Sequence, residues 1–144
     1  MFRFIDEKWL TIFVLTVFLT IQVSSVYSTD QLTATNSVNY SNEIFSINSS
    51  IQYTGPIYAI AISIFLPENV IYISSTTNSK PIIQPQKGDM GTIEFIWLKP
   101  PESPFHLNYL VKSASQSAII HSRVTYRRLN EELHYNLPEI KLIP

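Results

Sequence analysis

Three histidines are the first residues to weigh for chemistry: His106, His121 and His134. A metal site would need two or three of them at matched height on neighbouring strands. Each falls on the polar side of a stretch with strand-like alternation, where a solvated imidazole is ordinary. The serines include no Gly-x-Ser-x-Gly motif. We expect no catalytic residue, no metal ligand and no bound cofactor.

The acidic residues lead to the same expectation. Glu94 lies on the outward side of an expected strand and Glu102 in a proline-rich connector, so the pair faces no common cleft. Calcium binding at Asp89 is unsupported, because the dense Asp/Asn pattern of a calcium loop is missing. We expect both glutamates to be solvated.

Arginines near the C-terminus form a candidate binding patch. Arg123, Arg127 and Arg128, together with Lys112 and His121, could gather on one outer face and attract an acidic partner. Glutamates 131 and 132 follow at once and would neutralise such a patch. A simple solvated face is the alternative.

A second candidate surface is apolar. The stretch 57–66 is apolar on both sides, which suggests a central strand covered at least partly on its second side. Its outward residues, including Ile57 and Phe65, would mark an interface if exposed. A covering loop or the N-terminal strand is the alternative. The predicted interaction residues are Arg123, Arg127, Arg128, Ile57 and Phe65.

Aromatic residues could instead stack on sugars. The alternation places six of them inward, so core packing explains them better; they are Tyr53, Phe95, Trp97, Phe105, Tyr109 and Tyr126.

These residues sit on segments with a two-residue apolar period, which indicates half-buried strands. No stretch after residue 29 shows a helical apolar stripe. The prolines and glycines fall between the expected strands, as in Lys87–Gly91. We predict an all-β antiparallel two-sheet sandwich with Greek-key connections and seven or eight strands. The expected strands cover 31–37, 45–53, 57–66, 70–74, 93–97, 105–112, 120–127 and 132–135.

Composition limits the possible partners. The chain has 144 residues, 45% of them hydrophobic and 15% charged, with a net charge of −1 and no cysteine. This length suits one domain, and the charge gives no basic face for nucleic acid or an anionic membrane. The missing cysteine excludes disulfides, a Cys-ligated zinc and a thiol nucleophile.

The first 28 residues resemble a secretory signal peptide. Arg3 and Lys8 precede an apolar run over 9–26, and small residues follow up to Ser28. An uncleaved membrane anchor or a buried helix are the alternatives, because the run approaches the length of a bilayer span. We expect a signal segment over 1–28, a β-sandwich over 29–144, and a secreted or cell-surface location.

Three stretches carry a family resemblance: SINSSIQYTGPIYAIAISIFLPENVIYIS at 46–74, GDMGTIEFIWLKPPESPFHLNYLV at 88–111 and SRVTYRR at 122–128. Their strand order resembles the cohesin-like and immunoglobulin-like sandwich modules of bacterial surface proteins. The resemblance implies a binding or scaffold role toward another protein module or a polysaccharide, and it places no binding motif on specific residues. A duplicated calcium loop of the dockerin type is missing.

The expected function is therefore a non-enzymatic extracellular module for protein–protein or surface interaction. A carbohydrate-binding module and a subunit of a pilus or other surface polymer are the alternatives.

Overall fold

The computed structural model describes residues 31–114 and 117–144, and the predicted signal segment over 1–28 lies outside them. The described part is built from strands and turns. They are β1 (Leu32–Ser41), β2 (Ile44–Tyr53), β3 (Ala59–Phe65), β4 (Val70–Thr77), β5 (Thr92–Trp97), β6 (Phe105–Ser113), β7 (Ala118–Arg128), β8 (Glu131–Asn136) and β9 (Ile140–Leu142). Within this part, no helix could cross a bilayer.

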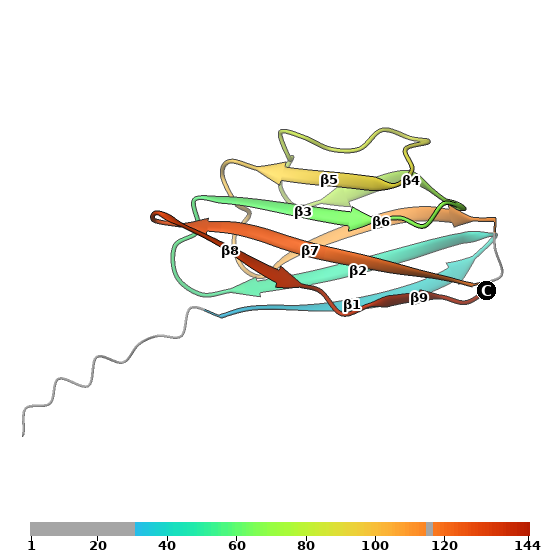
Figure 1. Ribbon diagram of the computed structural model, residues 1–144, viewed down its shortest axis with the longest axis horizontal. Coiled ribbons are helices and arrows are strands. Elements are labelled where there is room, and N and C mark those ends of the chain that lie inside the picture. The colour runs from blue at the N-terminus through green and yellow to red at the C-terminus, as the bar shows by residue number, and fades with distance from the viewer. Residues whose placement is uncertain (1–30, 115–116) are drawn as a thin grey trace, which may run out of the picture.

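The strands form two antiparallel sheets that pack face to face (Figure 1). One sheet has the order β1-β2-β6-β4, and the other has the order β5-β3-β7-β8, with β9 pairing to β7. From β2 to β7, each successive strand lies in the opposite sheet. Apart from β5 and β9, this is the ABED and CFG strand order of immunoglobulin-type sandwiches. The predicted all-β sandwich is confirmed.

Two-residue alternation explains why each strand has a buried side. On β2, Phe45, Ile47, Ser49 and Ile51 point inward, and the residues that alternate with them point to solvent or are half-buried. The same period buries Ile60, Ile62 and Ile64 on β3. Each such fully buried apolar side chain contributes about 1.5–3 kcal/mol of transfer free energy.

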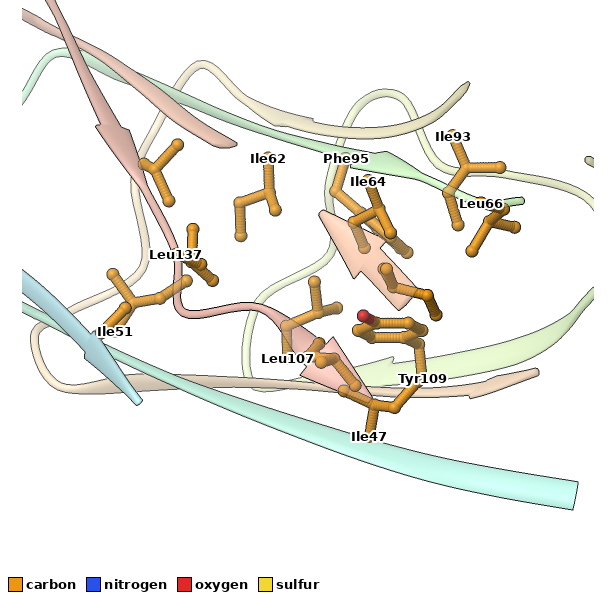
Figure 2. Close-up of a cluster of buried hydrophobic side chains, with 14 of the residues drawn as sticks. Ile47, Ile51, Ile62, Ile64, Leu66, Ile93, Phe95, Leu107, Tyr109 and Leu137 are labelled. Atoms are coloured by element: carbon orange, nitrogen blue, oxygen red, sulfur yellow. The ribbon is translucent and has the colours of Figure 1, made fainter. Parts of the chain in front are cut away.

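The core lies between the sheets and takes side chains from both (Figure 2). Ile47, Leu107 and Tyr109 come from one sheet and meet Ile62 and Ile64 of the other. Five of the six aromatic residues that the sequence places inward are buried, and the sixth, Tyr53, is half-buried against the core. The prediction that aromatics build the core is confirmed.

Turn chemistry fixes the register of the hairpin between β1 and β2. Asn42 and Glu43 form a two-residue loop with φ of 52° and 65°. Two positive φ values are the mark of a type I′ turn, which matches the twist of paired strands. Gly88 and Gly91, with φ of 99° and 71°, turn the chain back toward β5, as the sequence predicts.

The strand prediction misses one element. β9 lies beyond the last expected strand over 132–135, and it pairs with the first residues of β7. A three-residue strand has too few positions to show a period. Its pairing depends on the exposed end of β7, a tertiary feature that local patterning does not contain.

Candidate interaction surface

The outer surfaces of the two sheets differ in chemistry. Outside the β1-β2-β6-β4 sheet, the side chains are mainly hydroxyls and amides; we call this surface the neutral face. Its members include Thr33, Thr35, Ser37, Asn39, Ser46, Asn48, Ser50, Ser74, Thr76, His106 and Asn108. Outside the other sheet, charged groups of both signs stand among apolar and neutral polar side chains; we call this surface the charged face. Its members include Ala59, Ala61, Ser63, Phe65, Glu94, His121, Arg123, Thr125, Arg127, Glu132, His134 and Asn136.

Three of the five predicted interaction residues lie on the charged face. Arg123 and Arg127 are outward-facing on β7, and Phe65 ends the neighbouring strand β3. Phe65 pairs in register with His121, two residues before Arg123, and it is 39% exposed. The fold therefore brings Phe65 and Arg123, which are 58 positions apart in the chain, to one end of this face.

Arg128 does not join them, which corrects the predicted basic patch. It follows Arg127 on the strand, so its side chain points to the opposite, inward side of the sheet, and it is only 7% exposed. The guanidinium donates a hydrogen bond through Nη2 to the carbonyl of Thr54 and lies 5.6 Å from the ring centroid of Tyr126. Arg128 is a structural residue at one end of the sandwich.

Ile57 and Lys112 also lie elsewhere. Ile57 precedes β3, and its half-buried side chain packs against the core and does not extend the outer surface. Lys112 belongs to β6 in the other sheet, where its Nζ pairs with Glu43 Oε2 at 2.8 Å. This pair lowers the pKa of Glu43 and raises the pKa of Lys112, chiefly through the hydrogen bond between them.

A hollow of about 410 Å³ opens beside Phe65. His121, Arg123, Asn136 and Glu139 line it together with the phenyl ring. His121 Nδ1 lies 3.5 Å from Glu139 Oε1, and Arg123 Nε donates to Asn136 Oδ1 at 3.2 Å. The hollow thus joins an apolar ring to polar groups of both charges.

The other end of the charged face is shallower. A hollow of about 160 Å³ lies over the small residues Ala59 and Ala61, and Thr125, Arg127 and Glu132 border it. Arg127 Nη2 is 3.9 Å from Glu132 Oε2, so this acid, which follows the arginines in sequence, also lies beside Arg127 in space. Pairs this exposed contribute little stability and remain open to exchange partners.

One contact on this face has the residue types of a catalytic triad. Thr125 Oγ1 is 3.0 Å from His134 Nδ1, and Nε2 of the same ring is 3.7 Å from Glu132 Oε1. A nucleophile of this type also needs N–H donors for an oxyanion. Backbone groups of β7 here pair with β3 on one side and β8 on the other, so they are already used. The arrangement is a surface hydrogen-bond chain across two strands.

The remaining chemistry candidates are dispersed. His106 lies in the opposite sheet from His121 and His134, and no cluster of metal-ligand residues occurs within 31–114 and 117–144. Glu94 Oε1 accepts a hydrogen bond from Ser63 at 3.1 Å. Asp89 Oδ2 accepts one from the backbone N–H of Gln86 at 2.8 Å, which gives Asp89 a role in its turn.

The sequence did not predict a larger hollow among the loops. It measures about 680 Å³ and lies between residues 78–82 and the proline-rich connector 98–104. Trp97 Nε1 donates to the carbonyl of Ser79 at 2.8 Å and so ties the two loops together. The sequence signals these two loops only through their prolines, which are Pro81, Pro85 and the three prolines after Lys99.

Comparison with known proteins shows similarity in fold alone. No family model matches the chain, and no curated protein matches it. Among solved structures, the full-length major pilin SpaD from Corynebacterium diphtheriae is similar over 78% of this chain, with a TM-score of 0.55 and 9% identity. The match spans 35% of that pilin. The GAE domain of GGA2p from Saccharomyces cerevisiae aligns with 83% of this chain and 94% of its own, with a TM-score of 0.46 and 12% identity.

At 9% identity, the pilin likeness shows a shared architecture. It agrees with the strand order of the two sheets, which is that of an immunoglobulin-like β-sandwich.

Proposed function

We propose that this protein is a non-enzymatic module of the cell surface or extracellular space that binds another protein through its charged face. The observation that carries the proposal is the hollow beside Phe65. An apolar ring with charged and amide groups around it has the composition of a small protein–protein contact, with an apolar centre and a polar rim.

The contact groups are preorganised. Phe65 and Arg123 belong to β3 and β7, the two adjacent inner strands of this sheet. Backbone hydrogen bonds from β3 to both β5 and β7 hold them in place. Side chains on such a scaffold lose little backbone entropy on binding. Arg123 is also held by Asn136, which leaves the guanidinium's terminal nitrogens available to a partner's carboxylate.

Extracellular location is part of the proposal. It is supported by the order of residues over 1–28, basic then apolar then small, and by a sandwich fold that includes a pilin among its structural neighbours. The proposal includes a cohesin-like role, which is the binding of another protein module. It rests on the resemblance of the strand order to cohesin-like modules.

Surface-polymer assembly is the second candidate. The similar structure is that of a major pilin, and this chain covers about a third of its length. If the chain polymerises covalently, surface extracts will show a ladder of multiples of its mass on denaturing gels; a single band would argue against covalent assembly.

Sugar binding has less support on the described surface. The exposed aromatic residues are Tyr40, Tyr58 and Phe65. Tyr58 and Phe65 stand at opposite ends of β3, and Tyr40 lies in the other sheet against Phe45. Such a distribution forms no row for stacking pyranose rings.

Affinity capture from the source organism's extracellular fraction tests the main proposal. Wild-type protein is compared with a Phe65→Ala/Arg123→Glu variant and with a matched Tyr58→Ala/Lys112→Glu control that changes one aromatic and one basic residue elsewhere. We expect the first variant to lose at least tenfold of the wild-type capture of a defined protein, and the control to keep it. Equal capture by all three proteins would refute the role of the charged face.

A further inference from the structure

The neutral face contains two Asn-x-Ser triplets. They are Asn39-Tyr40-Ser41 on β1 and Asn48-Ser49-Ser50 on β2. Asn-x-Ser/Thr, with any residue but proline in the middle, is the acceptor sequence for N-linked glycosylation of exported proteins. The other asparagines of the chain stand outside such triplets; they are Asn36, Asn42, Asn69, Asn78, Asn108, Asn130 and Asn136.

Both triplet asparagines point to solvent from the same sheet. Asn39 pairs in register with Ser46, and Asn48 pairs with Ser37 on one side and Asn108 on the other. Because both have the outward parity of their strands, their amides emerge on the neutral face and are exposed. A glycan attached to either residue therefore projects away from the sandwich.

The two amides differ from other asparagines in their contacts. Asn36 accepts a hydrogen bond from Ser49 and donates one to the carbonyl of Pro138, and Asn108 accepts one from Ser46. Within the described residues, the side chains of Asn39 and Asn48 make no hydrogen bond to another side chain or to backbone. Attaching a glycan to these two nitrogens would break no contact of the fold.

The surroundings suit a sugar. Serines 37, 41 and 46 surround Asn39, and they are too small to cover it. Asn48 borders a hollow of about 330 Å³ whose wall also contains Thr76, His106 and Asn108. Hydroxyl and amide groups match the hydrogen-bonding groups of a first sugar residue, and charged groups enter this face only at its end, with Lys112 and Glu43.

We propose that Asn39 and Asn48 are N-glycosylated and that the neutral face is the glycan-bearing side of the sandwich. The donor is an oligosaccharide linked to a lipid phosphate or diphosphate, and an oligosaccharyltransferase catalyses the transfer. The asparagine Nδ2 bonds to C1 of the first sugar, the bond from C1 to the phosphate oxygen breaks, and the amide loses one proton as the lipid phosphate leaves. Glycans on this side would direct protein partners to the charged face.

The inference uses the proposed export of the chain and is independent of binding through the charged face. The test is intact-mass and glycopeptide mass spectrometry on the full-length gene product, produced in its source organism and fractionated into cellular and extracellular pools. Wild type is expected to carry a glycan mass on each of two peptides, one with Asn39 and one with Asn48.

Variants separate the acceptor sequence from the asparagine itself. Asn48→Gln and Ser50→Ala should each remove one glycan mass, Ser50→Thr should keep it, and Asn39→Gln should remove the other. Asn78→Gln is the matched control: Asn78 lines the same hollow, but Ser79 and Lys80 follow it, so the mass should not change beyond the substitution.

Extracellular wild-type protein with the bare polypeptide mass would overturn the inference while export stands. Bare protein confined to the cells would overturn both the inference and the proposed location. A glycan on only one of the two asparagines would overturn the two-site assignment. Because the wild-type glycopeptides are read directly, none of these outcomes depends on the folding of a variant.

Discussion

Arg128 shows how a charged residue can act as part of the framework. Its neighbour Arg127 is exposed on the charged face, whereas Arg128 is buried, donates to the Thr54 carbonyl and stacks over Tyr126. The hydrogen bond ties the end of β7 to the loop between β2 and β3.

Replacing these neighbours should therefore have very different consequences. Arg128→Ala removes packing of the side-chain stem, the hydrogen bond and the contact with the ring, so we expect a loss of about 2–3 kcal/mol in the free energy of unfolding. Arg127→Ala should stay within about 0.5 kcal/mol of wild type. Urea denaturation of both variants checks this, and equal losses would contradict the assigned burial.

Two tyrosines offer a second contrast. Burial raises the pKa of the Tyr109 hydroxyl, and the neighbouring Ser122 offsets only part of that rise, so the phenol stays neutral throughout the range in which proteins are usually folded. That hydroxyl completes no hydrogen bond of good geometry within the described residues. By contrast, the Tyr53 hydroxyl donates to the Pro101 carbonyl.

Removing the two hydroxyls should separate these roles. Tyr53→Phe should cost about 1 kcal/mol, because a carbonyl loses its donor. Tyr109→Phe should leave stability unchanged or raise it by up to about 1 kcal/mol, because a poorly partnered polar atom leaves the core. Thermal and urea unfolding give both values, and a loss of more than about 1 kcal/mol for Tyr109→Phe would disprove this account of the core.

At the scale of elements, the turn between β1 and β2 holds two non-glycine residues at positive φ. Asn tolerates this conformation, and Glu43 tolerates it less well, whereas Asn-Gly is the preferred sequence for a type I′ turn. Glu43 also pairs with Lys112 at the surface, so its replacement removes that contact too.

Glu43→Gly should raise the midpoint of thermal unfolding by a few degrees, because relief of backbone strain outweighs the loss of an exposed ion pair. Lys112→Gln removes the same ion pair without changing the turn and should leave the midpoint nearly unchanged. A lower midpoint for Glu43→Gly would show that the ion pair dominates at this turn.

Strand periodicity was enough to predict most elements. β2, β3, β5, β6 and β7 contain enough alternating residues to identify a buried side, and proline and glycine mark their ends. β9 was missed because three residues show no period. The alternation along β7 also places Arg128 on the same inward side as Val124 and Tyr126. Its charge alone is what assigns it to a patch with the other arginines.

At the scale of the whole molecule, the sequence predicted one sandwich but not which outer residues would share a face. Lys112 and Arg123 lie 11 positions apart, yet the crossing from β6 to β7 puts them on opposite faces. Phe65 and Arg123 are far apart in sequence, yet the pairing of β3 with β7 makes them neighbours. Such groupings depend on sheet topology, which strand patterns do not contain.

The division into a neutral and a charged face gives the molecule two sides with different surface chemistry. The exposed Phe65 and most of the outward charged side chains belong to the β5-β3-β7-β8 sheet. Outward amides and hydroxyls predominate on the β1-β2-β6-β4 sheet, with the Lys112–Glu43 pair at its end. We therefore expect a partner that recognises Phe65 as an apolar anchor beside charged groups to approach the β5-β3-β7-β8 sheet.

Site-specific photo-crosslinking on intact source cells tests that claim most directly. A photoreactive phenylalanine analogue replaces Phe65 in one protein, and Thr35 on the neutral face in another. The account predicts a crosslinked adduct of defined mass from position 65 and none from position 35. An adduct from position 35 alone would contradict it, as would the absence of any adduct at position 65.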